Sequence, residues 1–131
     1  MGMVADKNCV DIGILCGDIN ESLKFYEGLL GLEKIEEMPV PFGTMHRLAF
    51  GDSFVKLIDP DQVPPVGDLG LTKSLGFRYL TFQVGNIDEM CDACAAAGVA
   101  FEIEKVELKP GVTIAMVRDP DGNVIEFVQR A

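Results

Sequence analysis

DIGILCGDINESLKFYEGLLGLE, residues 11–33, decides the fold, because residues 79–102, YLTFQVGNIDEMCDACAAAGVAFE, repeat its pattern. In both copies a short run of strand-forming residues leads to a helix-capping residue, with a glutamate three positions later. These pairs are Asp18 with Glu21, and Asn86 with Glu89. Each expected helix has apolar residues at helical spacing and stops at a glycine, Gly31 or Gly98. The repeat predicts two similar modules.

Further strands follow each expected helix. They are residues 32–37, TMHRLAF (44–50) and FVKLID (54–59) in the first half, and residues 99–106, VTIAMVR (112–118) and NVIEFVQ (123–129) in the second. The order βαβββ followed by βαβββ predicts an α+β fold with mixed sheets in one domain, residues 1–131. Module one spans about residues 8–60 and module two about 77–130, with a proline- and glycine-rich linker at 61–76.

Composition excludes several classes of partner. The net charge of -10 disfavours nucleic acid and anionic membranes, because both attract Lys and Arg. No apolar run approaches the ~20 residues that span a bilayer, and the first ten residues lack the features of a signal peptide. We therefore expect a cytoplasmic protein whose four cysteines are free thiols.

Two stretches resemble a known superfamily. GDINESLKFYEGLLGLE (residues 17–33) is similar to the strand-helix phrase of the vicinal oxygen chelate superfamily, and RDPDGNVIEFV (residues 118–128) to its C-terminal hairpin. The family includes glyoxalase I, extradiol dioxygenases, fosfomycin-resistance enzymes and bleomycin-binding proteins. The resemblance spans roughly Val10 to Val128 and implies two modules curled into a cup, with helices outside, and assembly as a homodimer.

The resemblance also locates the family's usual metal ligands. Metal-dependent members place one ligand on the first and one on the last strand of each module, typically His or Glu. The corresponding residues here are Asp11, Lys56, Tyr79 and Glu126. Only Glu126 is of the usual ligand type, because Lys56 is itself a cation and Tyr79 is normally protonated. We expect no intact four-ligand site and no other cofactor, with Asp11 and Glu126 as weak candidates for a hard divalent cation.

Strand pairing predicts which side chains share a face. If Gly51-Asp52 is a two-residue turn, Arg47 lies opposite Lys56, and both point away from the helix side. Alternation on the other strands adds further residues to the expected cup. The full set is Asp11, Arg47, Lys56, Tyr79, Thr81, Gln83 and Glu126, with Phe54 as a stacking surface. His46 falls on the opposite face and is not expected to be catalytic.

The most specific hypothesis concerns Lys56. Its positive charge would take the place that a metal ion fills in related proteins, paired with the carboxylates of Asp11 and Glu126. Arg47 would add a planar donor fork for a carboxylate or phosphate, so the expected ligand is a small anionic or oxygenated molecule. Simpler interpretations remain open. Glu126 could belong to a structural ion pair, the two cations could extend to the rim, and Tyr79 could be a packing aromatic.

Three functions are compatible with these residues. A glyoxalase-like lyase or isomerase would use Glu126 as general base, Lys56 and Arg47 to stabilise an enolate, and Tyr79 as hydrogen-bond donor. A non-catalytic binder of the bleomycin-resistance type would use Phe42, Phe54 and Tyr79 as stacking surfaces. A divergent metalloenzyme would use Asp11 with Glu126.

The CDAC sequence at residues 91–94 has the spacing of a redox or metal motif, but it falls within an expected helix. We interpret it as packing, with Cys94 pointing inward and Cys91 near the surface.

Overall fold

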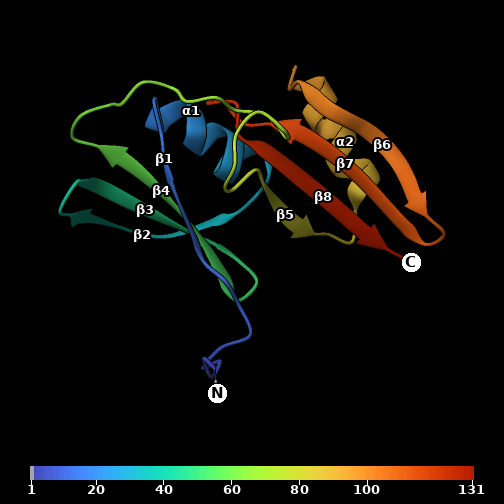
Figure 1. Ribbon diagram of the computed structural model, residues 1–131, viewed down its shortest axis with the longest axis horizontal. Coiled ribbons are helices and arrows are strands. Elements are labelled where there is room, and N and C mark those ends of the chain that lie inside the picture. The colour runs from blue at the N-terminus through green and yellow to red at the C-terminus, as the bar shows by residue number, and fades with distance from the viewer. Residues whose placement is uncertain (1) are drawn as a thin grey trace. The chain divides into compact units, whose positions relative to one another are not determined.

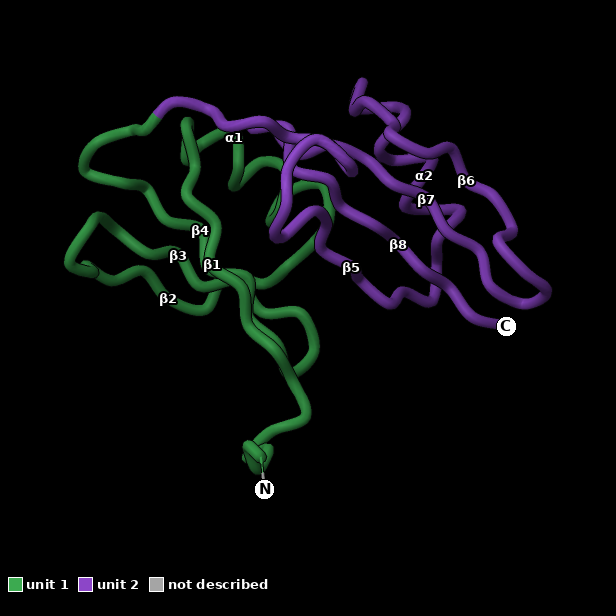
Figure 2. The backbone as a smooth tube through the Cα atoms, in the orientation of Figure 1, with its two compact units in different colours: residues 1–64 green, residues 65–131 purple. Residues whose placement is uncertain are grey.

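The computed structural model describes residues 2–131, and the chain divides into two compact units, residues 1–64 and 65–131 (Figure 2). Unit 1 contains β1 (Ile12–Leu15), α1 (Ile19–Leu23), the π-helix η1 (Lys24–Leu29), β2 (Glu33–Val40), β3 (Gly43–Phe50) and β4 (Ser53–Pro60). Unit 2 contains β5 (Tyr79–Gln83), α2 (Ile87–Ala96), β6 (Phe101–Lys109), β7 (Val112–Arg118) and β8 (Val124–Arg130). The two equivalent orders confirm the predicted α+β fold of tandem βαβββ modules.

Each unit holds one four-stranded mixed sheet. The strand order is β1-β4-β3-β2 in unit 1 and β5-β8-β7-β6 in unit 2. The first and last strands of each module pair in parallel, and the other neighbours are antiparallel. In unit 1, α1 packs against β4; in unit 2, α2 packs against β7 and β8 (Figure 1). One face of each sheet is therefore covered by its own helix.

The β3–β4 hairpin has the register expected from its two-residue turn. Arg47 lies opposite Lys56, and Leu48 lies opposite Val55. Leu48 and Leu57 are 0% exposed, which places the apolar set on the helix side. Burying such a leucine contributes about 1.5–3 kcal/mol, and a one-residue slip would move every buried side chain to the other face.

The first helix differs from a simple α-helix. Asp18 caps it as predicted, because its Oδ1 accepts from the main-chain N–H of Asn20 at 3.0 Å and of Glu21 at 3.3 Å. After Leu23 the chain continues as the wider η1 turn. Phe25 and Tyr26, although consecutive, are 6% and 0% exposed and contact each other edge to face. The wider turn accompanies the burial of both rings.

The start of the second helix is hydrogen-bonded to a residue distant in sequence. Asn86 makes no side-chain bond to the helix main chain; its Nδ2 donates to Glu89 Oε2 at 2.8 Å. The N–H of Ile87 instead donates to Gln129 Oε1 at 2.8 Å, from β8. Asn86 is therefore the N-cap residue, as predicted, but its side chain accepts no helical N–H, and the neighbouring strand supplies the acceptor for the first one.

None of the helices in residues 2–131 is long and apolar enough to cross a bilayer.

Candidate functional site

Lys56 lies on the face of the unit 1 sheet opposite the one that carries Leu48 and Leu57. It is half-buried on β4, between Gly13 of β1 and Arg47 of β3. A side chain at Gly13 would meet no atom within 4 Å, so there is open space beside the lysine. Within residues 2–64 no carboxylate forms an ion pair with Lys56. Lys56 is thus half-buried, and its ammonium has no acidic partner in its own unit.

Arg47 adds a second cation with unused hydrogen-bonding capacity. Its Nη1 lies 2.9 Å from Glu36 Oε1 on β2. Its Nε is buried and has no hydrogen-bond partner among the described residues. The guanidinium carbon lies 5.2 Å from the centre of the Phe54 ring, and Lys7 Nζ lies 5.3 Å from the same centre. Arg47, Phe54 and Lys56 are called the Lys56 surface below.

Asp11 is engaged by the main chain. Its Oδ1 accepts from the N–H of Phe54 at 2.7 Å, just before β1 begins its parallel pairing with β4. It makes no ion pair with Lys56 in the described residues. Through its hydrogen bond to the N–H of Phe54, Asp11 holds the start of β4 in place. The expected pairing of Lys56 with Glu126 joins residues of different units and stays a prediction.

Glu126 occupies the corresponding position in unit 2. Its neighbours Ile125 and Phe127 are each 1% exposed on the helix side, whereas Glu126 is half-buried on the opposite face. Thr81 lies directly across the parallel β5–β8 pair, and its Oγ1 donates to Glu126 Oε1 at 2.7 Å. This charge-assisted hydrogen bond orients the carboxylate. The alternation predicted for β8 is confirmed.

Strand β5 contributes two further residues to the same face as Glu126. Tyr79 begins the strand and is 53% exposed, and Gln83 ends it and is also exposed. Alternation places both with Thr81. Within residues 2–131 the Tyr79 hydroxyl has no hydrogen-bond partner, so it is available to a ligand. The structure therefore places Tyr79, Thr81, Gln83 and Glu126 together on one face of unit 2.

The residues at the family's metal positions do not fit a four-ligand centre. Lys56 carries a positive charge and Tyr79 is a phenol, and neither suits the hard or borderline cations that bind His and Glu. Asp11 and Glu126 each already accept a hydrogen bond. Among residues 2–131 no group of three or more His, Cys, Asp or Glu side chains is placed to hold a metal.

The single histidine lies away from the candidate site. His46 is 7% exposed, on the face opposite Arg47 as expected, and its Nδ1 lies 3.3 Å from Glu37 Oε1. The hydrogen bond from Lys34, followed by the charges of Lys34 and His46, lowers the pKa of Glu37. His46 therefore belongs to a separate charged cluster on the helix-facing side of the sheet.

The cysteines of α2 are packed thiols. Cys94 is 0% and Cys91 is 7% exposed, so the expected position of Cys91 near the surface is wrong; the sheet covers it as well. Burial raises the pKa of Cys91 and raises that of Cys94 to about 11. Both side chains are therefore neutral packing groups with little thiolate at neutral pH.

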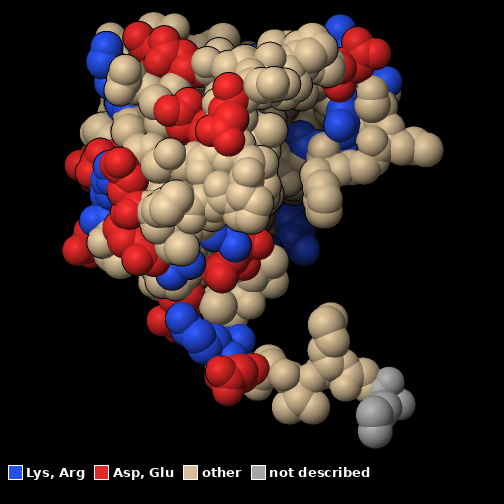
Figure 3. Space-filling model, turned by 90° about the vertical axis from the view of Figure 1, so that its left-hand side faces the viewer, with Lys and Arg blue, Asp and Glu red and all other residues tan. Residues whose placement is uncertain are grey.

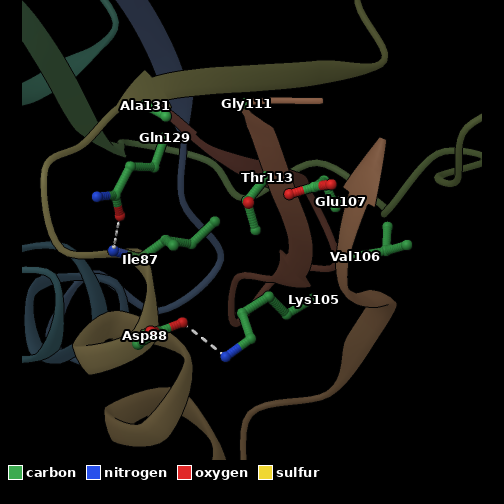
Figure 4. A pocket seen from close by; sticks show the side chains of 9 residues that line it. All are labelled: Ile87, Asp88, Lys105, Val106, Glu107, Gly111, Thr113, Gln129 and Ala131. Atoms are coloured by element: carbon green, nitrogen blue, oxygen red, sulfur yellow. Dashed lines mark hydrogen bonds and ion pairs between the residues drawn. The ribbon is translucent and has the colours of Figure 1, made fainter. Parts of the chain in front are cut away.

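Unit 2 also has a concave surface that the sequence did not indicate. A cavity of about 400 Å³ lies between the start of α2 and strands β6 to β8 (Figure 4). Lys105 Nζ lies 2.6 Å from Asp88 Oδ1, and Gln129 accepts from Ile87. Because these groups already satisfy each other, they act as structural links between α2 and the sheet.

Charged side chains of both signs are interspersed on the face drawn in Figure 3, and no broad basic area is visible there. With a net charge of -10, the chain places its cations among many acids. Within residues 2–64, Lys56 is a half-buried cation that has no acidic partner.

Comparison with known proteins agrees with this architecture. A probable lactoylglutathione lyase from Vibrio cholerae is 33% identical over 118 residues, which cover 86% of this chain and 83% of the relative. A lactoylglutathione lyase from Neisseria meningitidis is 30% identical over 120 residues, covering 87% and 84%. An antibiotic binding protein from Streptomyces has the same fold, with a TM-score of 0.75, 23% identity and coverage of 98% and 100%.

A family model matches almost the whole chain, residues 9–127, and spans both units. The chain belongs to the Glyoxalase/Bleomycin resistance protein/Dioxygenase superfamily.

Proposed function

We propose that this protein is a glyoxalase-like lyase or isomerase that acts on a small oxygenated or anionic metabolite without the usual four-ligand metal site. The observation that carries the proposal is the Lys56 surface. There the half-buried residue Lys56, without an acidic partner in its unit, lies opposite Arg47, whose buried Nε lacks an acceptor among the described residues. Relatives named lactoylglutathione lyase, at 30 to 33% identity, support the lyase class.

The chemistry that fits these side chains is proton removal next to a carbonyl group. Removing that proton leaves negative charge on the carbonyl oxygen, which Lys56 and Arg47 would stabilise. Glu126 is the candidate general base, with its carboxylate oriented by the Thr81 hydroxyl. Tyr79 would donate a hydrogen bond to the substrate. Returning the proton to the neighbouring carbon completes an isomerisation with no change in overall composition.

The remaining residues have binding roles in this proposal. Phe54 offers a ring flanked by cations, against which a planar part of the substrate can pack. Gln83 supplies an exposed amide at the end of β5. Asp11 acts indirectly, because its hydrogen bond to the Phe54 N–H positions the start of β4.

Deuterium exchange tests catalysis across a whole class of candidate substrates. A panel of small α-hydroxy and α-keto acids, their phosphate esters and S-lactoylglutathione would be incubated with the protein in deuterated buffer. Proton NMR would follow loss of the signal next to each carbonyl. We expect exchange for at least one compound, loss of exchange but retained binding in Glu126→Gln, and loss of both in Lys56→Met. Glu104→Gln, at an exposed position of β6, is the matched control.

A non-catalytic binder is the second candidate, because the aromatic and cationic Lys56 surface would also suit simple capture of an anion. Saturable binding with no exchange for any bound compound would favour the binder and contradict the enzyme. A divergent metalloenzyme using Asp11 and Glu126 predicts stoichiometric metal and a metal-dependent rise in Tm that Glu126→Gln abolishes. Measurement of metal content with a thermal scan over Mg, Mn, Fe(II), Co, Ni and Zn distinguishes it.

We also propose a cytoplasmic homodimer without nucleic-acid or membrane partners. The family resemblance supports the dimer, and the net charge of -10 supports the absence of polyanionic partners. Light scattering coupled to gel filtration measures the mass directly. A monomer at micromolar concentration would contradict the dimer.

A further inference from the structure

A second group of cations lines a hollow in the segment before β5. Residues 71–78 surround a concave space of about 420 Å³ within unit 2. Its lining includes the side chains of Lys73 and Arg78 and the hydroxyls of Thr72 and Ser74, but no acidic residue. Both charged residues of this lining are cations, in a chain with a net charge of -10.

Arg78 is held in place by the main chain. Its Nη1 donates to the carbonyl oxygens of Asp68 and Gly70, both at 3.2 Å. Its Nε is buried and has no hydrogen-bond partner in the described part of the chain. A buried donor without an acceptor is costly, so a ligand oxygen that reached it would recover a charge-assisted hydrogen bond.

Lys73 lies close to Gly70, one of the two residues that hold Arg78. Its Cγ and Cδ lie 3.5 Å from the position that a Cβ on Gly70 would occupy, and the Gly70 carbonyl is one of the acceptors of Arg78. Lys73 is exposed and forms no ion pair among residues 2–131. Arg118 Nη2 also approaches this Cβ position, at 3.7 Å, but it lies 2.6 Å from Glu102 and is neutralised. Lys73 and Arg78 are therefore the uncompensated charges.

The hydroxyl groups can complete the coordination of an anion. Ser74 Oγ donates to the Asp68 carbonyl at 3.4 Å, which holds the loop closed. The Thr72 hydroxyl has no partner within the described residues and can donate. This arrangement contrasts with the cavity in Figure 4, where Lys105 is already paired with Asp88.

We infer that this hollow binds the oxyanion group of a small molecule, a phosphate or a carboxylate, through Arg78, Lys73 and Thr72. A guanidinium with an unused N–H, an ammonium and a hydroxyl are the donors that such a group accepts. The space exceeds the volume of a bare anion, so the rest of the ligand lies along the loop, with Leu71 as an apolar wall. The inference does not rest on the proposed lyase activity.

The test uses the whole protein and two simple probes. Amide signals of ¹⁵N-labelled protein would be followed during titration with inorganic phosphate and, separately, with acetate at constant ionic strength. We expect saturable shifts centred on residues 68–78 with at least one probe, and the stronger probe identifies the preferred anion. Lys73→Met should weaken binding about tenfold or more, the loss of one hydrogen bond to a charged group. It leaves the Arg78 contacts to the loop intact.

Variants inside and outside the hollow distinguish a specific anion site from non-specific attraction between charges. Arg78→Gln should also lose affinity, whereas Lys109→Met and Arg130→Gln, exposed cations elsewhere in unit 2, should bind as the unmodified protein does. Absence of saturable shifts with both probes overturns the inference. An equal loss of affinity in Lys109→Met and Arg130→Gln overturns it as well, because the anion would then be attracted by the overall charge of the protein and not by this hollow.

Discussion

Replacement of Lys56 by methionine separates the role of this residue in binding from any role in folding. Methionine preserves much of the length and the apolar character of the stem and removes the ammonium. Lys56 has no carboxylate partner within residues 2–64, so no ion pair is lost there. We expect the free energy of unfolding to stay within about 0.5 kcal/mol of the unmodified protein, or to rise, because a half-buried charge is removed.

The expected effect on ligand affinity is larger. A hydrogen bond from a charged donor to an anion contributes about 1.5–3 kcal/mol net. Since about 1.4 kcal/mol corresponds to a tenfold change in Kd, losing it weakens binding roughly 10- to 150-fold. Coulomb attraction at 4 Å with an effective dielectric of 20 is about 4 kcal/mol, which sets an upper bound.

Urea denaturation and calorimetric titration measure the two quantities on the same samples. The titrant is the anion that raises Tm most in the unmodified protein. Lys34→Met is the control, because Lys34 pairs with Leu48 and so lies on the opposite face of the same sheet. Lys34 also binds Glu37 at 2.9 Å, an exposed pair worth little. Unchanged affinity in Lys56→Met, or an equal loss in Lys34→Met, would refute the assignment of the Lys56 surface.

Three other contacts lead to predictions of their own. Thr81→Val removes the donor to Glu126 without changing shape, so we expect about tenfold slower deuterium exchange with an unchanged KM; an unaltered rate would argue against Glu126 as base. Leu57→Ala, at a fully buried position, should lower the free energy of unfolding by about 2–5 kcal/mol in urea. The pKa of Cys94 is raised from 9.0 to about 11, so its thiol should resist thiol reagents at pH 8 until unfolding. The folded state favours the neutral thiol, so the contribution of Cys94 to the free energy of unfolding is complete below pH 9.0 and is lost as the pH rises to about 11. Cys94→Ala should remove this part of the fall in stability at high pH.

The faces of the strands could be predicted because they depend on local geometry. The two-residue turn at Gly51-Asp52 sets the β3–β4 register, so Arg47 opposite Lys56 followed from counting residues. Likewise, Ile125 and Phe127 on either side of Glu126 placed the carboxylate on the open face, since successive side chains alternate.

The ends and the turn type of the helices were harder to predict from the sequence. The sequence predicted the Asp18 cap, which depends on residues only two and three positions apart. It did not predict η1, where Phe25 and Tyr26 are both buried and contact each other edge to face, because helical spacing alone does not indicate a wider turn. The helix α2 begins after Asn86 as predicted, but the acceptor for the N–H of Ile87 comes from Gln129, a contact 42 positions away that no local pattern indicates.

The sequence by itself determined the family, the repeated module and which side chains share a face of each sheet, because these follow from periodicity, turns and short motifs. Only the tertiary structure decided how the polar groups are paired. Asp11 accepts from Phe54 across 43 positions, and Ile87 donates to Gln129 across 42. Such partners are chosen by which donors and acceptors folding brings within about 3 Å, and no local pattern records that distance.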